Sequence, residues 1–244
     1  MATGQSDGAG RLGHSEPGAG AMRRTVGILG GMGPEATVEL MARVISAVKA
    51  RDDADHIPLI VDQNPQVPSR IARLIEGRGE DPSVVLCQMA RRLEQAGAKA
   101  LAMPCNTAHH YASDIRGSVS VPFLDMIDAS AAALGAGTVG LLASPAVRRV
   151  GVFDAALAGR TVTHPDQEAA LALIRRVKVD GATDAARADF VKLAIATGGD
   201  TCLVACTEFS LLASAARQAG LRVVDTLDCL VAQIVGFSTG GLDG

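Results

Sequence analysis

The sequence is poor in aromatic residues. It contains no Trp, one Tyr and five Phe among 244 residues, so only 2% of the chain is aromatic. Few rings are available to stack on bases or to form a sugar-binding platform, and aliphatic side chains must make the core. An excess of positive charge is also lacking, because 23 Lys and Arg face 26 Asp and Glu. We therefore expect no broad phosphate-neutralising face and no nucleic-acid partner.

Long apolar runs and paired cysteines are missing as well. No apolar stretch reaches the length that a bilayer crossing needs, and the N-terminus lacks the compact apolar run of a secretory signal. We predict a cytoplasmic protein with no membrane partner. The five cysteines are odd in number and form no C-x-x-C pair, which argues against a disulfide framework or a structural zinc site. Some of them are expected to be reactive thiols.

The sequence does contain 48% apolar residues, enough for one large or two small cores. Residues 1–22 are rich in Gly and lack periodicity, which predicts a flexible leader. From Thr25 onward, short apolar runs alternate with longer stretches of helical period, and this rhythm predicts a parallel sheet covered by helices. Eight strands are predicted: Thr25–Leu29, Leu59–Asp62, Ala98–Met103, Val121–Leu124, Thr138–Leu142, Arg160–Thr163, Thr201–Ala205 and Leu221–Val224.

The first four predicted strands and the last four look like copies of each other. Three matches occur in the same order: Thr25–Leu29 with Thr138–Leu142, Gly97 and Cys105 with Gly198 and Cys206, and Asp125–Asp128 with Asp225–Asp228. Unrelated parallel-sheet halves also share Val, Gly and Leu, but three matches in one order favour a duplication. The sequence therefore predicts an α/β fold of two pseudo-symmetric, doubly wound parallel-sheet domains.

The offset between the copies falls from 113 residues at the first match to 100 at the last. The first copy thus holds about a dozen extra residues, which we place around Asn64–Gly79. We expect the first domain over 23–125 and the second over 126–225. The segment 226–237 is expected to pack back on the first domain, and 238–244 is expected to be a tail.

Cys105 and Cys206 occupy equivalent places, each at the carboxyl end of a predicted strand and just before a predicted helix. Open α/β sheets bind ligands at this edge, so two facing domains would put one thiol on each side of a cleft. A carbon acid that loses its proton from one face and regains it on the other needs an acid/base group on each side. Helix N-termini and nearby cations lower a thiol pKa from about 8.5, and we expect one thiolate at physiological pH. The pattern predicts stereoinversion.

The residues that follow the two cysteines suit a carboxylate substrate. Asn106, Thr107 and Thr207 offer amide, hydroxyl and backbone N–H donors at helix starts. Glu208 either meets the substrate or complements the helix dipole. The three remaining cysteines are interpreted as small buried hydrophobes.

Two other interpretations of this region are open. His109 and His110 follow Cys105 closely enough to form a metal site with it, but no catalytic zinc motif accompanies them, so we predict no metal. Asp125 and Asp225 either line the cleft or cap the helices that follow.

Two further segments stand out. Gly30–Ala36 satisfies the pattern G-x-G-x-x-A of dinucleotide-binding proteins, but Pro34 removes a backbone N–H that a pyrophosphate would need. We interpret this run as a tight turn into a proline-initiated helix. In the loop Gln63–Arg70 two prolines stiffen the chain, so Arg70 is either presented to a carboxylate or is a solvated surface residue. Lys178 is equally undecided by its neighbours.

Four motifs carry a resemblance to a known family: GILGGMGPEAT at Gly27–Thr37, NPQVPSR at Asn64–Arg70, MPCNTAH at Met103–His109 and ACTE at Ala205–Glu208. With them the sequence resembles the aspartate/glutamate racemase family, in its aspartate racemase branch, from about Thr25 to Val235. The resemblance implies two pseudo-symmetric α/β domains, a homodimer, and racemisation without a cofactor by Cys105 and Cys206 as the acid/base pair. It also implies substrate contacts from Met32, Arg70, Asn106, Thr107, Lys178 and Thr207. Glu208 resembles the aspartate branch, because glutamate racemases usually carry His there, and we predict it as a further substrate contact.

Two departures from the family pattern bear on the substrate. Ala205 stands where Gly is common, and Ala143 to Val147 replace a threonine-rich turn, with Ser144 as a substitute hydroxyl. We predict an isomerase, namely an amino-acid racemase for a small acidic substrate such as aspartate or glutamate, with no cofactor and no metal. Two alternatives use the same cleft: a thiol-dependent cis/trans isomerase of a dicarboxylate, and a non-catalytic amino-acid-binding protein.

Overall fold

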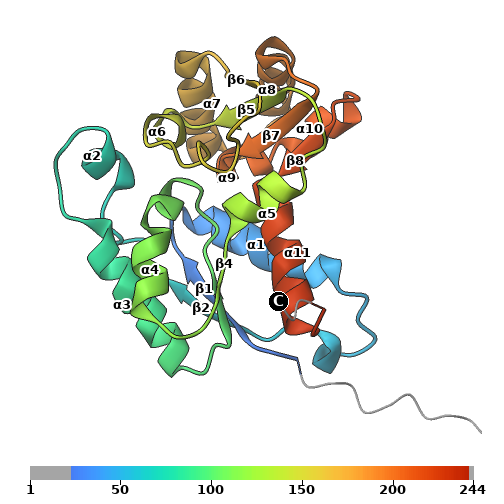
Figure 1. Ribbon diagram of the computed structural model, residues 1–244. Helices are drawn as coiled ribbons and strands as arrows, with labels where there is room; N and C mark the ends of the chain where they lie inside the picture. Colours follow the sequence, from blue (N-terminus) through green and yellow to red (C-terminus); the bar gives the residue numbers. More distant parts are fainter. Residues whose placement is uncertain (1–22, 242–244) are drawn as a thin grey trace, which may run out of the picture.

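The structure is a computed structural model that describes residues 23–241. The predicted leader over 1–22 and the last three residues of the predicted tail lie outside this range. Two four-stranded parallel sheets form the framework, in the orders β2-β1-β3-β4 and β6-β5-β7-β8 (Figure 1). The identical order in the two halves is the arrangement that the sequence repeats predicted, and the predicted fold class is confirmed.

Each predicted strand overlaps a strand of the structure. The strands are β1 Val26–Gly30, β2 Leu59–Gln63, β3 Ala100–Ala102, β4 Phe123–Leu124, β5 Val139–Ala143, β6 Val162–Thr163, β7 Thr201–Ala205 and β8 Val223–Asp225. The helices are α1 Pro34–Ala47, α2 Arg70–Leu74, α3 Pro82–Gln95, α4 Ala112–Ser118, α5 Met126–Ala132, α6 Pro145–Arg149, α7 Gln167–Asp180, α8 Asp184–Thr197, α9 Thr207–Ser210, α10 Ala213–Gln218 and α11 Thr226–Ser238, with short 3-10 helices η1 Asp53–Asp55 and η2 Thr107–Tyr111.

The strand register corrects the predicted place of the extra residues in the first half. Val26 pairs with Leu59, 33 positions later, whereas its counterpart Val139 pairs with Val162, only 23 positions later. The additional residues therefore lie between the first two strands, in the long helix α1 and the turn after it, and not around Asn64–Gly79. The sequence offsets at the later matches could not separate these two places, because both lie upstream of Gly97.

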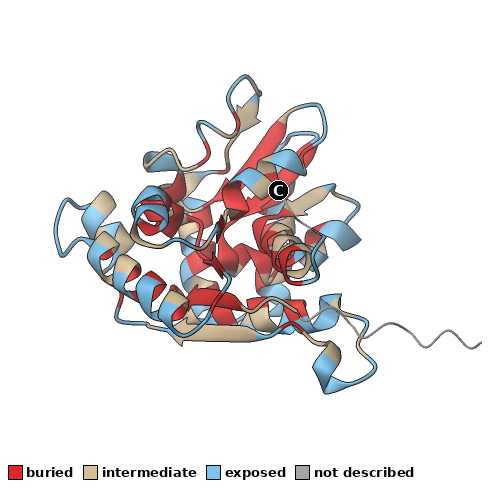
Figure 2. Cartoon of the chain, turned by 60° about the horizontal axis from the view of Figure 1, so that its bottom comes forward, coloured by how far each residue is buried: buried red, intermediate tan, exposed pale blue. Residues whose placement is uncertain are grey.

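Alternate residues of each strand face two different cores. Val26 and Ile28 in the first sheet and Leu141 in the second belong to one continuous central core. On their other faces, Leu101 packs with α3 and α4, whereas Val204 packs with α7, α8 and α10. Figure 2 shows the buried residues where the strands meet the inward sides of the helices, with exposed residues on the outer sides and loops. The two sheets thus share a central core and each has an outer core of its own.

The C-terminal helix α11 joins the two halves. It contacts α1 and α5, and it also reaches strands of both sheets, β3 and β4 in the first and β7 and β8 in the second (Figure 1). Leu230 and Ile234 of this helix are fully buried in the central core. No helix within residues 23–241 is both long and apolar enough to cross a bilayer.

Candidate active site

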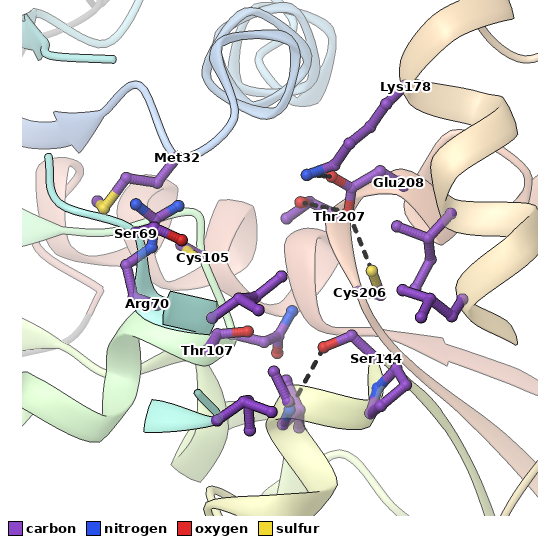
Figure 3. Close-up of a pocket in the computed structure, with 18 of the residues that line it drawn as sticks. Met32, Ser69, Arg70, Cys105, Thr107, Ser144, Lys178, Cys206, Thr207 and Glu208 are labelled. Atoms are coloured by element: carbon purple, nitrogen blue, oxygen red, sulfur yellow. Dashed lines mark hydrogen bonds and ion pairs between the residues drawn. The ribbon is translucent and has the colours of Figure 1, made fainter. Parts of the chain in front are cut away.

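One cavity of about 420 Å³ opens between the two halves at the carboxyl ends of the strands. All nine residues that the sequence predicted for the site line it: Met32, Arg70, Cys105, Asn106, Thr107, Lys178, Cys206, Thr207 and Glu208. Figure 3 shows Met32, Ser69, Arg70 and Cys105 grouped on one side, facing Lys178, Glu208 and Cys206 on the other. The two thiols therefore come to a common space from equivalent positions of the duplicated fold.

The first thiol lies in a turn directly after β3. Pro104 follows Met103 at the strand end, and the Cys105 N–H donates to the Met103 carbonyl at 2.9 Å. Asn106 then begins η2, so that polar groups of this turn face the cavity. Cys105 is buried and packs with Met32 in the outer core of the first half.

The second thiol lies at the start of α9. Cys206 has an extended backbone and is the N-cap of this helix. Its Sγ donates to Glu208 Oε2 at 3.0 Å, and Glu208 Oε1 lies 3.2 Å from Lys178 Nζ. The Thr207 hydroxyl is 3.5 Å from the same Glu208 Oε2 (Figure 3). A carboxylate and an ammonium are thus lined up on the Cys206 side of the cavity.

The electrostatics correct one expectation about the thiols. Burial raises the pKa of Cys105, although the Arg70 guanidinium and the Ala108 backbone N–H act in the opposite direction. Burial raises the pKa of Cys206 further, since the Glu208 carboxylate beside it adds to the effect. Helix starts and cations therefore do not bring either thiol toward a neutral pKa.

The polar residues of the cavity differ in how they are engaged. Arg70 opens α2, and its Nη1 donates to the carbonyl oxygens of Val67 and Pro68, both at 3.2 Å. No acidic side chain within residues 23–241 forms an ion pair with it. The Asn106 amide donates to the Thr226 hydroxyl at 3.1 Å, so this donor is already occupied. The Asn106 Oδ1 is buried and has no partner in the described part of the chain.

Several lining residues were not predicted from the sequence. Ser144, by contrast, was predicted. It lines the cavity, and its hydroxyl oxygen caps α6 by accepting from the Val147 N–H at 3.3 Å. The unpredicted residues are mostly apolar and come from α2 with the turn after it and from α7: Ile71, Ile75, Leu171 and Ile174, with Ser69, Glu76 and Arg175. Pro145, Ala146, Val147 and Ala205, which depart from the family pattern, line the cavity as well. In α7 the spacing of Leu171, Ile174 and Lys178 marks one helical face. From the sequence, that spacing could have identified the face of α7 that lines the cavity.

The remaining candidates lie outside the cavity. Asp125 and Asp225 cap α5 and α11, respectively, so their capping interpretation holds. The His109 ring faces the Cys105 carbonyl and is absent from the lining. Of the three cysteines interpreted as buried hydrophobes, Cys202 is buried, but Cys87 and Cys229 are only partly buried.

Comparison with known proteins identifies the family of this fold. The family model described as Asp/Glu/Hydantoin racemase matches residues 29–234. The chain belongs to this racemase family. The resemblance that the motifs indicated is thereby confirmed, and as a racemase family member the chain is an isomerase.

Relatives of the chain cover most of its length. The broad specificity amino-acid racemase RacX of Bacillus subtilis (strain 168) is 26% identical over 223 residues, which are 86% of this chain and 96% of that protein. The structure of Picrophilus torridus aspartate racemase superposes with a TM-score of 0.79 at 29% identity, over 89% of this chain and 94% of that one. Glutamate racemase isoform RacE1 from Bacillus anthracis gives a TM-score of 0.63 at 17% identity, over 91% and 84% of the two chains, and shares the fold.

Proposed function

We propose that the chain interconverts the L and D forms of an amino acid with Cys105 and Cys206 as its two acid/base groups. The observation that carries the proposal is that both thiols line one cavity from equivalent strand ends of the two halves. In one direction a thiolate takes the α-proton while the other thiol protonates the opposite face of the carbanion. The roles are exchanged in the reverse direction, and neither pyridoxal phosphate nor a metal takes part.

The lining residues supply contacts for the common part of an amino acid. Arg70, which no described carboxylate neutralises, suits the substrate carboxylate, and Thr107 and Thr207 offer donors at the starts of two helices. The unpartnered Asn106 Oδ1 suits the substrate ammonium. Charge that develops next to the α-carbon would be stabilised by the same donors.

We propose a small acidic amino acid, aspartate first and glutamate second, as the substrate. The likeness to an aspartate racemase and the cations Arg70 and Lys178 in the cavity support this choice. A second candidate is a racemase with a wider substrate range. It is favoured by the apolar walls that α2 and α7 contribute, because side chains such as Ile71 and Ile174 accept an uncharged substrate group.

Proton NMR in heavy water tests the proposal directly. The purified protein should remove the α-proton signal of aspartate, and polarimetry should show racemic product. Cys105→Ala and Cys206→Ala should each lower racemisation by about 10²- to 10⁴-fold. Near wild-type racemisation by both variants would contradict the two-base assignment.

The same panel distinguishes the alternatives. Conversion of maleate to fumarate without exchange into amino acids would indicate the thiol-dependent cis/trans isomerase. Saturable binding of an amino acid without loss of any α-proton would indicate a binding protein. Exchange into apolar amino acids as fast as into aspartate would favour the wider substrate range.

The homodimer and the cytoplasmic location implied by the sequence are also proposed. Light scattering on the purified protein should give twice the mass of one chain.

A further inference from the structure

The turns that carry the two cysteines are each held from behind by the residue four positions later, through the ring of His109 in the first turn and the backbone N–H of Ser210 in the second. His109 lies four residues after Cys105, and its Nδ1 is 2.8 Å from the Cys105 carbonyl oxygen. Because a carbonyl oxygen only accepts, Nδ1 must carry the proton. Ser210 lies four residues after Cys206, and its backbone N–H donates to the Cys206 carbonyl oxygen at 3.0 Å. Its hydroxyl oxygen lies 3.4 Å from the same carbonyl, but a hydroxyl has one proton, and Asp225 Oδ1 is the nearer acceptor. Neither side chain lines the cavity.

Each of these side chains faces an aspartate that follows or ends the neighbouring strand. The His109 Nε2 lies 3.9 Å from Asp125 Oδ1, beyond hydrogen-bond distance. Burial lowers the pKa of His109, so the ring is neutral with its proton on Nδ1, and the two side chains form no ion pair. The Ser210 hydroxyl donates to Asp225 Oδ1 at 2.6 Å. Asp125 and Asp225 are the matching aspartates of the sequence repeat, and each also caps the next helix through its Oδ1. The duplication has thus preserved an acceptor behind each cysteine turn.

An arginine completes each arrangement. Arg116 of α4 donates to Asp125 Oδ2 at 2.5 Å, within the first half of the chain. Arg43 of α1 donates to Asp225 Oδ2 at 2.7 Å and also to the Ser210 carbonyl at 2.7 Å. Since α1 belongs to the first half, the Cys206 turn is fixed by a side chain from the opposite half of the molecule. Asp225 is almost completely buried, so water does not compete for the contacts of its carboxylate.

We propose that these contacts form two positioning networks: the His109 ring orders the Cys105 turn, and Ser210 with Asp225 and Arg43 orders the Cys206 turn. The inference rests on the two-cysteine racemisation proposed above. A cysteine side chain has a single rotatable bond before its sulfur, so the backbone of the turn fixes the Cβ and limits the sulfur to three staggered positions. A misplacement of about 1 Å costs on the order of 10²-fold in rate. Each network therefore serves one face of the substrate.

Racemisation itself cannot separate the two networks, because its equilibrium constant of one ties the kcat/KM values of the two directions together. Elimination of HCl from β-chloroalanine is free of this constraint. One thiolate takes the α-proton, the C–H electron pair becomes the Cα=Cβ bond, and chloride leaves with the C–Cl pair. The aminoacrylate then hydrolyses to pyruvate and ammonium. Each enantiomer needs a base on one face only, and Cys105→Ala and Cys206→Ala show which enantiomer depends on which thiol.

The test compares elimination from the two enantiomers by variants of each network. Ser210→Ala should slow elimination from the enantiomer that depends on Cys206 by about tenfold to 10²-fold, and leave the other nearly unchanged. His109→Gln, whose amide extends toward Asp125 and away from the Cys105 carbonyl, should slow elimination from the enantiomer that depends on Cys105. His109→Asn, whose amide N–H takes the place of the Nδ1–H, should keep the rate of this elimination near that of the wild type. Thr197→Val is the matched control, because it removes a buried hydroxyl that donates to the carbonyl four residues back, at 2.8 Å in α8.

Three results overturn the inference, and they differ in what else they contradict. If Ser210→Ala and His109→Gln slow both enantiomers equally, as Thr197→Val would through stability alone, the networks support the fold only. If His109→Asn fails to restore what His109→Gln loses, the carbonyl contact has no positioning role. If the wild-type protein neither racemises nor eliminates, the proposed function fails and the inference fails with it. A wild type that does both, with cysteine variants selective for opposite enantiomers, keeps the proposed function intact whatever the network variants do.

Discussion

Glu208 lies between the Cys206 thiol and the Lys178 ammonium, and it touches both. In the sequence it looked like a substrate contact or a dipole partner at a helix start. The structure adds that its carboxylate accepts the hydrogen bond of the thiol. A carboxylate in this place favours the neutral thiol over the thiolate, because two negative charges so close together are mutually unfavourable. In the enzyme without substrate the neutral form of Cys206 is thus favoured, while Arg70 on the other side favours ionisation of Cys105.

Glu208→Gln should therefore lower the pKa of Cys206. The substitution removes the negative charge but keeps a side chain of the same shape, so the thiolate forms at a lower pH. The pH dependence of Cys206 alkylation by iodoacetamide, followed by mass spectrometry of its own peptide, measures this pKa. The peptide that contains Cys202 is the control, because burial alone, without a carboxylate, raises the pKa of this thiol. An unchanged or higher pKa for Cys206 would contradict the assignment.

The raised thiol pKa values also predict the pH profile of the wild type. Since burial raises the pKa of both thiols above their usual range of about 8.5, the fraction of enzyme with one thiolate grows as the pH rises above neutral. The kcat/KM for racemisation should increase about tenfold per pH unit between pH 7 and 8. Initial rates by polarimetry across this interval check it, and a flat profile would mean that the free enzyme already holds a thiolate.

Among the elements of the fold, the turn between β1 and α1 depends on a glycine whose backbone conformation and close contacts both disfavour a side chain. Gly31 has a φ of 93°, and a Cβ at this position would lie 2.4 Å from the Asn64 backbone. The Gly31 N–H also donates to the Thr37 hydroxyl, which closes the turn beside Met32. This turn and the loop that leads to Arg70 are therefore packed backbone to backbone.

Gly31→Ala should destabilise the protein by more than about 1 kcal/mol, because both the backbone conformation and the space are wrong for a side chain. It should also raise the KM, since Met32 and Arg70 lie on the two segments that are pushed apart. Gly117→Ala is the matched control: it lies in α4, and a Cβ there meets nothing within 4 Å. Chemical denaturation should show that the control is neutral or more stable by up to about 1 kcal/mol. Equal effects of the two substitutions would contradict the packing argument.

The sequence predicted the elements whose residues alternate regularly or repeat. The strands were recognised from short apolar runs, and the cysteine turns from their equal places in the two copies. The apolar walls of the cavity could not be recognised, because residues such as Ile71 and Leu171 cannot be told from core residues by their sequence pattern. The partner of Lys178 was also hidden, since Glu208 lies far from it in the sequence and only the packing of α7 against α9 brings them together. Three-dimensional neighbours of this kind leave no local pattern.

At the scale of the whole molecule, the shared central core makes the two halves depend on each other. Side chains of both sheets, such as Ile28 and Leu141, belong to one cluster, and α11 closes it from the end of the chain. The first half cannot complete its core alone, because α11, which contacts its helix α1, follows the second half in the sequence. The Arg43 ion pair with Asp225 joins the halves at a second point. We therefore expect the chain to unfold as one unit in spite of its duplicated architecture.

Ile234→Ala tests this expectation. Ile234 is fully buried in the central core, so its truncation should cost about 2–5 kcal/mol. At roughly 2–4 °C per kcal/mol for a chain of this size, the melting temperature should fall on the order of 10 °C. Differential scanning calorimetry should show a single transition in wild type and variant alike, with equal calorimetric and van't Hoff enthalpies. Ile195→Ala, on the exposed side of α8, should leave the melting temperature nearly unchanged. Two transitions, of which Ile234→Ala shifts only one, would mean that each half is stable through its outer core alone.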